Sequence, residues 1–423
     1  MSELSYLEKL LDGAEVEWLP LGDISEIYGG LTGKTKSDFD DGNAKYISYK
    51  SIFGCIDIKQ TPADTVKIGE GENQHRVRHG DVLFTGSSEI AEEAGMSSAI
   101  TIEFDEPIYL NSFSFGVRFN KDTNIIPEFS KYLFRTSFMR TELSKTASGV
   151  TRFNISKDRF RKVLIPIISP NNPEKSLAIQ SEIVRILDKF TALTAELTAE
   201  LTARKKQYNY YRDQLLSFEE GEVDWKSLGE IGQVRMCKRI LKAQTTTDGD
   251  IPFYKIGTFG KSPDAYISRA VFEELKSKYN YPKTGEILIS ASGTIGRTVI
   301  FNGEESYFQD SNIVWIENNE NTVTNKYLFH FYKIAKWDIA EGGTIQRLYN
   351  ENLRKLLIPV PYPEDRKKSL QEQARIVAIL DKFDSLTNSI TEGLPREIEL
   401  RQKQYEYYRD LLFSFPKPES VTK

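Results

Sequence analysis

From Lys175 to Glu220 the chain contains neither glycine nor proline, and apolar or aromatic side chains recur at alternating steps of four and three residues. The steps pass through Ile183, Leu187, Phe190, Thr194, Leu197, Leu201, Tyr208, Tyr211, Leu215 and Phe218. Arg204 interrupts this seam. The spacing is typical of a coiled coil and predicts one long helix.

A second seam of the same kind lies near the end of the chain. It passes through Ile376, Leu380, Phe383, Thr387, Ile390, Leu394, Tyr408, Leu411 and Phe415. The stretch "EGLPRE" places Gly393 and Pro395 inside this pattern, which predicts a break or kink near Leu394. Two such seams in one chain favour antiparallel packing of the two helices.

The remaining apolar runs are short and predict strands. They are "KYISY" (45–49), "DVLFTG" (81–86), "SAITI" (98–102), "FSFGVRF" (113–119), "IPFYKI" (251–256), "EILIS" (286–290), "RTVIF" (297–301) and "NIVWI" (312–316). Each group of four is followed by an aromatic-rich helical segment, at 128–143 and at 325–339. The helical spacing of these aromatic residues favours a role in the core.

Internal repeats organise the whole chain. "IVRILDKF" (183–190) returns as "IVAILDKF" (376–383), "RKKQYNYYRDQLLSF" (204–218) as "RQKQYEYYRDLLFSF" (401–415), "RKVLIP" (161–166) as "RKLLIP" (354–359), and "GDVLFTGSS" (80–88) as "GEILISASG" (285–293). In addition, "YLEKLL" (6–11) resembles "YRDQLL" (211–216). The N-terminus is therefore predicted to be the tail of a helix whose body lies at the other end of the chain.

These repeats predict an α+β fold with a pseudo-twofold internal repeat. Two mixed α/β domains are joined by two long antiparallel coiled-coil helices. The expected boundaries are 1–24 for the N-terminal helix tail and junction, 25–165 for the first domain, 166–220 for the central helix, 221–358 for the second domain and 359–423 for the C-terminal helical region.

Composition narrows the class of protein. The chain has 423 residues, two cysteines, three histidines and a formal net charge of −5. Its acidic N-terminus and the lack of a long uncharged apolar window predict a cytoplasmic protein without a membrane span. Cys55 and Cys237 are interpreted as small buried apolar groups, and no metal site is expected. The negative charge argues against a free-standing nucleic-acid binder, so a DNA role would need basic loops or a partner.

No motif in the chain supports a catalytic centre. "GGLTGKT" (29–35) ends like a phosphate-binding loop but has Tyr28 where that motif requires glycine, and "GTIGRT" (293–298) lacks a dinucleotide fingerprint. "NNPE" (171–174) lacks the second proline and the aromatic ring of an amino-methyltransferase motif. The adjacent acids Glu92 and Glu93 are interpreted as solvated surface.

The repeated half, the "RKVLIP" and "RKLLIP" strands, the "GDVLFTGSS" and "GEILISASG" loops and a twofold "TAEL" word together resemble the specificity subunit of type I restriction-modification enzymes, in particular the IC subfamily. The resemblance covers the full chain and is strongest in 1–24, 163–231 and 355–419. It implies two target recognition domains, each binding one half of a split site in double-stranded DNA. It also implies that the subunit has no active site of its own.

The same resemblance implies the partners and their cofactors. The two helices would hold two methyltransferase (M) subunits, and restriction (R) subunits would join this core. S-adenosylmethionine, ATP and Mg²⁺ would be used by those partners, and no cofactor is expected in this chain.

Candidate DNA-contacting residues are taken from the polar loops, because Arg and Lys bind base edges or phosphates and small hydroxyl residues approach the backbone closely. In the first domain they are Lys34, Lys36, Lys50, Ser87, Ser88 and Arg152; in the second, Arg239, Lys242, Lys255, Ser292, Thr294, Arg297 and Arg347. "SGVTRFN" (148–154) and "GGTIQRL" (342–348) occupy aligned positions. Arg152 and Arg347 are therefore expected to contact the DNA backbone near the root of each domain.

The "TAEL" word is the candidate spacer element. It consists of Thr194, Ala195, Glu196 and Leu197, followed at once by Thr198, Ala199, Glu200 and Leu201. A coiled-coil adaptor with two protein-binding modules is the alternative class. The repeated word and the divergent loops on a duplicated frame favour the DNA-reading class, and competition by specific duplex DNA in a gel-shift experiment would separate the two.

Overall fold

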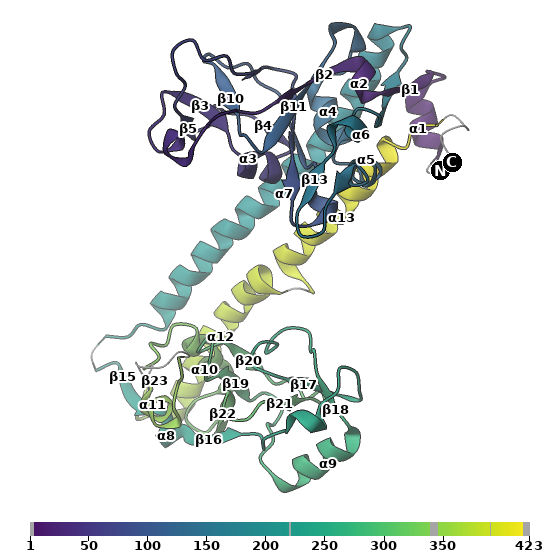
Figure 1. The fold of residues 1–423 in the computed structure, drawn as a ribbon. Helices are drawn as coiled ribbons and strands as arrows, with labels where there is room; N and C mark the ends of the chain where they lie inside the picture. Colours follow the sequence, from purple (N-terminus) through teal and green to yellow (C-terminus); the bar gives the residue numbers. More distant parts are fainter. Residues whose placement is uncertain (1–3, 220, 339–345, 390, 418–423) are drawn as a thin grey trace. The chain divides into compact units, whose positions relative to one another are not determined.

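The computed structural model describes residues 4–219, 221–338, 346–389 and 391–417, and it divides into two compact units. The first unit contains the chain up to Leu197 and from Ile398 onward, and the second is Thr198–Glu397. Each unit consists of a mixed α/β domain together with parts of the long helices (Figure 1). The predicted fold class is confirmed.

The first unit begins with a short helix and is rich in short strands (Figure 1). Its elements before the long helix are α1 (Leu4–Leu11), β1 (Val16–Pro20), α2 (Leu21–Ile24), β2 (Ser25–Gly29), η1 (Lys36–Phe39), β3 (Ala44–Ile47), α3 (Tyr49–Gly54), β4 (Asp57–Ile58), β5 (Thr65–Val66), β6 (Arg76–Val77), β7 (Val82–Thr85), β8 (Ser87–Ser88), η2 (Ala91–Glu93), β9 (Ser97–Ile100), β10 (Ile108–Leu110), β11 (Ser114–Phe119), η3 (Lys121–Thr123), α4 (Pro127–Leu133), α5 (Ser137–Ser144), β12 (Ala147–Ser148), β13 (Phe153–Ile155), α6 (Lys157–Phe160) and β14 (Leu164–Ile168). The long helix α7 (Pro173–Leu215) follows.

The second unit contains a similar succession of elements. They are β15 (Val223–Ser227), α8 (Leu228–Ile231), β16 (Gly232–Met236), η4 (Lys242–Gln244), β17 (Ile251–Tyr254), β18 (Tyr266–Ile267), α9 (Arg269–Lys278), β19 (Ile287–Ser290), β20 (Thr298–Ile300), β21 (Tyr307–Phe308), β22 (Ile313–Asn318), α10 (Asn325–Tyr332), α11 (Asn350–Lys355), β23 (Leu357–Pro361) and α12 (Arg366–Asn388). The last helix, α13 (Gly393–Leu412), begins in this unit and ends in the first.

The main sheets of the two α/β domains share the order of four strands. The main sheet has the order β2-β11-β7-β9-β4 in the first unit and β16-β22-β19-β20 in the second. A parallel pair, β3 with β10 or β17 with β21, belongs to a smaller sheet in each. A two-stranded ribbon, β1 with β14 or β15 with β23, leads into a long helix in each. The internal repeat predicted from sequence is therefore present in the strand order.

The aromatic-rich segments contribute to the cores, as their spacing predicts. Phe129, Tyr132 and Phe134 are buried in the first unit, and Tyr327 and Tyr332 in the second. The helix boundaries differ from the expectation. The segment 128–143 forms two helices, because the chain leaves α4 at Leu133 and the side chain of Thr136 caps α5 by accepting a hydrogen bond from the Met139 N–H. The helix expected over 325–339 ends at Tyr332.

Helix α7 has 43 residues, which corresponds to roughly 65 Å at 1.5 Å per residue. In the first unit Phe190 stacks on Tyr408 of α13 with ring centroids 5.3 Å apart, and in the second Tyr211 stacks on Phe383 of α12 at 5.5 Å. Phe190, early in α7, therefore contacts α13, the later of the two partner helices, whereas Tyr211, late in α7, contacts the earlier helix α12. Contacts in this order are expected for antiparallel helices. Tyr211 is nevertheless 39% exposed, so this seam position is only partly covered.

The second seam is interrupted slightly before the predicted point. Helix α12 ends at Asn388 and α13 begins at Gly393, while the seam residue Ile390 lies outside the described residues. Gly393 has φ +75°, and a Cβ there would lie 2.4 Å from the Ser385 carbonyl oxygen. The first residue of α13 must therefore be glycine, because any side chain there would collide with the Ser385 carbonyl. Pro395 falls in the first turn of α13, where a missing N–H costs little.

The N-terminal helix and the end of the chain share one hydrophobic core. Leu7 and Leu11 of α1 belong to the same cluster as Leu412, Phe413 and Phe415. The indole N–H of Trp18, on the following strand β1, donates to the Pro416 carbonyl at 2.8 Å. The two ends of the chain thus lie in one core, and the expectation from the repeated "YLEKLL" word that the N-terminus is the tail of a helix from the other end stays a prediction.

The two cysteines have different surroundings. Cys237 is 2% exposed, and burial raises the pKa of its thiol to about 12. Cys55 is exposed, at the end of α3. The interpretation of both cysteines as buried groups is therefore wrong for Cys55, because the chain leaves the core directly after the buried Ile52.

A buried glutamine joins the α/β domain of the first unit to α7. Gln180 is 2% exposed, and its Oε1 accepts from the Ile126 N–H at 3.0 Å. Its Nε2 donates to the Asn124 carbonyl at 2.7 Å and to Ser176 Oγ at 3.0 Å. The amide thus satisfies backbone groups on the segment between η3 and α4, and it fixes the position of that segment on the helix.

The second unit repeats this contact at the equivalent position. Gln373 of α12 is fully buried, accepts from the Thr324 N–H at 2.9 Å, and donates to the Thr322 carbonyl at 2.9 Å and to Ser369 Oγ at 3.2 Å. Gln180 and Gln373 are 193 positions apart, the same offset as the "IVRILDKF" and "IVAILDKF" copies. We refer to each set of contacts as a glutamine clamp.

We expect Gln180→Ala to lower the free energy of unfolding by about 1–3 kcal/mol, because it leaves the part-buried Ile126 N–H and Asn124 carbonyl without their partner. Urea unfolding monitored by circular dichroism would measure the change. Gln214→Ala is the matched control, since Gln214 is exposed on the same helix and its truncation should cost less than about 0.5 kcal/mol. Equal stability of the two variants would contradict the structural role of the clamp.

Candidate nucleic-acid interface

The loop that carries Ser87 and Ser88 is built by a short strand pair in the first unit. Strand β8 pairs with β13 in the register Ser88 with Phe153 and Ser87 with Asn154. Gly86 precedes this pair, and its N–H donates to the Phe113 carbonyl at 2.8 Å. A Cβ on Gly86 would lie 2.7 Å from that oxygen, so glycine is required for the close approach.

Arg152 lies beside this loop. Its Nε and Nη2 donate to Ser87 Oγ at 3.1 and 2.9 Å, and its guanidinium lies 5.5 Å from the centroid of the Phe113 ring. Ser87 and Ser88 are buried, whereas Arg152 is exposed. The structure therefore brings together three candidate residues from segments about 65 positions apart.

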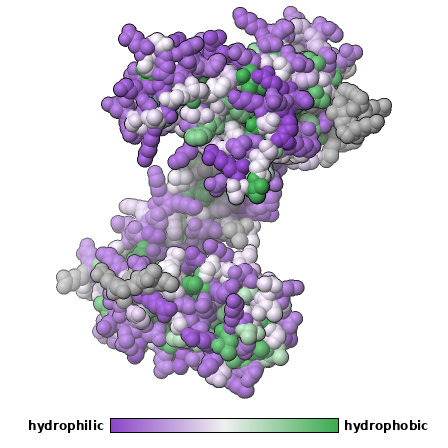
Figure 2. Space-filling model, in the orientation of Figure 1, coloured by the Kyte–Doolittle hydropathy of each residue, from purple (hydrophilic) through white to green (hydrophobic). Residues whose placement is uncertain are grey.

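These residues line an open cleft of about 550 Å³, which we call the Arg152 cleft. Its other lining residues are Tyr49, Phe53, Glu89, Ile90, Glu93, Phe113 and Thr151. Phe113 is 61% exposed and Ile90 is 50% exposed, on a molecule whose visible surface is mostly hydrophilic (Figure 2). Sequence reasoning missed Phe113 because it placed this residue inside a strand, whereas β11 begins at Ser114.

The second unit places the aligned loops against each other in a similar way. Ser292 and Arg347 form an antiparallel β-bridge, and the Leu348 N–H donates to the Ala291 carbonyl at 2.8 Å. The Ser292 hydroxyl donates to Asn312 Oδ1 at 2.8 Å, while Arg347 is exposed. The backbone frame is thus shared, but the side-chain contacts differ. Residues 342–345 of the aligned "GGTIQRL" segment lie outside the described residues.

The other candidates in the first unit are separate from the cleft. Lys36 and Lys50 are exposed, at the start of η1 and in α3. The side chain of Lys34 is only 7% exposed, and its ammonium lies 2.6 Å from the carboxylate of Glu72. Hydrogen bonds from Lys34, from the Gly69 N–H and from Gln74 lower the pKa of Glu72 to about 2. Lys34 is thus held by a local ion pair.

In the second unit several candidates also have local partners. Arg239 pairs with Asp310 and Lys255 with Asp264, each at 2.9 Å. Arg297 donates from Nη1 to the Phe259 carbonyl at 2.9 Å. Lys242 and Thr294 are exposed. The roles of these candidate residues in DNA contact stay predictions. Lys34 and Arg297 are bound to groups of their own domain, Glu72 and the Phe259 carbonyl.

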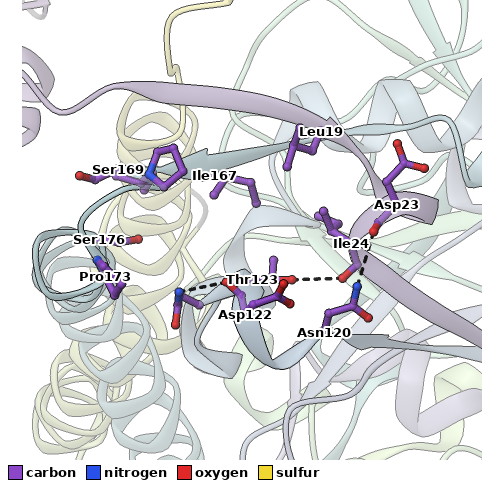
Figure 3. A pocket seen from close by; sticks show the side chains of 13 residues that line it. Leu19, Asp23, Ile24, Asn120, Asp122, Thr123, Ile167, Ser169, Pro173 and Ser176 are labelled. Atoms are coloured by element: carbon purple, nitrogen blue, oxygen red, sulfur yellow. Dashed lines mark hydrogen bonds between the residues drawn. The ribbon is translucent and has the colours of Figure 1, made fainter.

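A smaller hollow of about 170 Å³ lies at the root of the first α/β domain, next to the start of α7 (Figure 3). Its polar groups bond to neighbouring backbone: Asn120 to the Asp23 carbonyl, Thr123 to the Ile24 carbonyl and Asn124 to the Asp122 carbonyl. The sequence-derived candidates lie elsewhere. We assign this hollow a structural role.

The "TAEL" copies lie in the least buried part of α7. Thr194, Leu197 and Leu201 are half-buried, and of the described residues between Leu187 and Tyr208 none is fully buried. The border between the two compact units falls between the copies, after Leu197. An insertion of one copy would therefore lengthen the helix between the units.

Two properties of the described residues concern metals and membranes. No group of three or more His, Cys, Asp or Glu side chains in this part of the chain could hold a metal ion. None of the helices found there is long and apolar enough to cross a membrane. The described residues form a duplicated α/β frame with divergent polar loops, attached to long helices, and this arrangement is typical of a protein with two binding domains.

The family model for the type I restriction modification DNA specificity domain matches residues 14–204 and 222–400. The chain belongs to this family, which confirms the resemblance seen in its motifs. A Haemophilus influenzae protein assigned as a type I restriction enzyme specificity subunit is 47% identical over 97% of this chain and 98% of its own length. The EcoR124I/EcoR124II specificity subunit of Escherichia coli is 39% identical over the full length of both chains.

Solved structures agree on the fold. A chain from a structure of type I restriction-modification complex assembly and conformational transition has a TM-score of 0.57, with 94% of this chain and 97% of that chain covered, at 16% identity. The specificity subunit from M. genitalium has a TM-score of 0.50, with 96% and 98% covered, at 14% identity. The IC subfamily stays a prediction.

Lys34→Met should raise the pKa of Glu72 from about 2 toward its ordinary value of 4.5. The carboxylate form is favoured in the folded chain, so its contribution to stability is present above pH 4.5 and is lost as the pH falls through about 2. NMR titration of protein labelled at the Glu carboxyl carbons would measure the shift. Lys36→Met, which removes an exposed neighbouring lysine, is the control, and a Glu72 pKa unchanged by Lys34→Met would refute the ion pair.

Proposed function

We propose that this chain is the DNA-reading subunit of a type I restriction-modification complex, in which each α/β domain binds one half of a split DNA site. The observation that carries this proposal is that the two domains share a backbone arrangement but differ in the side-chain hydrogen bonds of their equivalent loops. Ser87 bonds to Arg152 in one domain, while the equivalent Ser292 bonds to Asn312 in the other. Two related readers with different side chains fit two different half-sites.

Each domain would enter the major groove of its half-site. Exposed lysines such as Lys36, Lys50 and Lys242 suit phosphates, which set the position and orientation of a protein on the duplex. Ser87, Ser88, Ser292 and Thr294 lie on loops that are candidates for a close approach to the phosphates, and the sequence assigns Arg152 and Arg347 to the DNA backbone near the root of each domain. The glutamine clamps would transmit the position of each domain to its helix.

The long helices would serve as the scaffold for two methyltransferase subunits, and restriction subunits would join the same core. The methyltransferases would flip one adenine from each half-site and methylate it with S-adenosylmethionine. ATP and Mg²⁺ would be used by the restriction subunits, and this chain would perform no catalysis. We expect the complex in the cytoplasm. Partners can supply much of the positive charge that a chain of net charge −5 lacks.

The "TAEL" copies would set the distance between the half-sites. Four residues advance a helix by about 6 Å and rotate it by a net of about 40°, given 3.6 residues per turn. One base pair of B-DNA turns by about 34–36° and rises about 3.4 Å. One added copy would therefore rotate one domain by nearly the twist of one base pair, and a tilted helix could take up the surplus rise.

Replacing residues 25–150 by the equivalent region of the Escherichia coli relative should change one half of the methylated sequence and leave the other half unchanged. The reason is that each domain has its own sheets, core and clamp. Single-molecule sequencing of methylated adenines in cells that carry the hybrid complex would give the result. A simultaneous change in both halves would refute the two-reader model.

A third "TAEL" copy inserted after Leu201 should lengthen the unread spacer by one base pair, from an expected six or seven, and leave both half-sites unchanged. Deletion of one copy should shorten the spacer or abolish methylation. Sequencing of methylated adenines in strains with each length variant is the measurement. An unchanged spacer in a fully active three-copy variant would reduce the repeat to a plain helical segment.

A further inference from the structure

We propose that the Arg152 cleft reads base-pair edges, and that Arg152 recognises a guanine within the half-site of the first domain. The inference rests on the proposed function and deepens it, because it assigns one residue to one base. It also differs from the expectation drawn from the sequence, in which Arg152 contacts the DNA backbone.

Arg152 is held in place before any ligand binds. Its partner Ser87 is 5% exposed and lies in the β8–β13 pair, and the Ser87 carbonyl accepts from the Tyr49 hydroxyl at 2.9 Å. The Phe113 ring lies against the guanidinium at 5.5 Å. A long side chain that is already oriented loses less conformational freedom on binding, so it binds a ligand of matching geometry more tightly than a free one.

The contacts to Ser87 leave a suitable pair of donors. A guanidinium has five N–H groups in a planar fork, and Ser87 Oγ takes the Nε–H and one Nη2–H. The second Nη2–H and the Nη1–H beside it form two near-parallel donors. Guanine presents O6 and N7 as two neighbouring acceptors in the major groove, and a bidentate arginine is their commonest partner.

The composition of the cleft argues for bases over phosphates. Among the described residues that line it, Arg152 is the single cation, and Glu89 and Glu93 are two carboxylates. Two negative groups would repel a phosphate, and phosphate sites are normally basic. A carboxylate can instead accept from the N4 amino group of cytosine, the partner of guanine. The exposed Phe113 and Ile90 suit the apolar methyl group of thymine.

The second unit does not repeat this arrangement in its described residues. There Asn312 accepts the hydroxyl of Ser292, the equivalent of Ser87, and Arg347 meets Ser292 through the backbone bridge. Loss of the Arg152 fork should therefore affect one half-site alone.

The test uses the complete methyltransferase complex assembled with Arg152→Ala or with Arg152→Lys. Both variants should relax one guanine position of one half-site in the methylated sequence and leave the other half and the spacer unchanged. Preference for guanine at that position should fall about 5- to 150-fold, the range for one bidentate contact. Lysine should not rescue it, because it keeps the charge but lacks the fork.

Two further variants make the result specific. Ser87→Ala should relax the same position more weakly, since it removes only the group that orients Arg152. Arg159→Ala is the matched control, because Arg159 is an exposed arginine on α6 of the same domain and lies outside the cleft, and the methylated sequence should stay as in wild type. If methylation by a variant is too weak to sequence, competition binding with duplexes carrying each base at each position gives the same readout.

Two outcomes would overturn the inference. One is a methylated sequence that does not change in Arg152→Ala. The other is equal weakening on all sequences with a salt dependence reduced by about one ion, the behaviour of a phosphate contact. Failure of the proposed function would look different, because the wild-type complex would then show no sequence-specific methylation.

Discussion

The glutamine clamps are the constraint on which the remaining architecture depends. A protein with two DNA-reading domains can set the distance between two half-sites only if each domain is fixed to the helix to which it is attached. Gln180 and Gln373 provide the fixation through buried side-chain amides that bond to part-buried backbone groups of the adjoining domain. A buried backbone group without a partner is costly, so this contact resists sliding or rotation of the domain on its helix. An apolar interface alone would be less directional.

Beyond the Gln180 clamp, α7 has an interval in which few side chains are buried. Leu187 and Tyr208 are buried, while Thr194, Leu197 and Leu201 are only half-buried. A four-residue insertion in this interval disturbs few close contacts, whereas one near Ile183 would displace a fully buried side chain. The "TAEL" word also restores an apolar residue to the seam and consists largely of good helix formers. The repeat therefore lies in the part of α7 where the loose packing of the helix tolerates an insertion best.

The sequence was sufficient for the elements whose pattern is long or repeated. The heptad spacing from Ile183 predicts α7, and the offset of 193 positions predicts a second unit with the same strand order. The site was less predictable, because its contacts join residues that are distant in sequence. Arg152 meets Ser87 only through the β8–β13 pairing, and Lys34 meets Glu72 across 38 positions. Neither partnership has a local spacing that a pattern could detect.

The chain passes from one unit to the other twice, each time within a helical segment. One is α7, anchored by Gln180 in the first unit and by Tyr208 in the second; the other runs from α12, anchored by Gln373, to α13, anchored by Tyr405. The interval of α7 after Leu187 carries the repeat, and no described side chain in it is fully buried before Tyr208. The equivalent buried residue Leu380 is instead followed by two separate helices, because α12 ends at Asn388 and α13 begins at Gly393. The duplicated words "IVRILDKF" and "IVAILDKF" therefore lead into different helical segments, so the internal repeat extends to the domains and their attachment but not to the whole of the long helices.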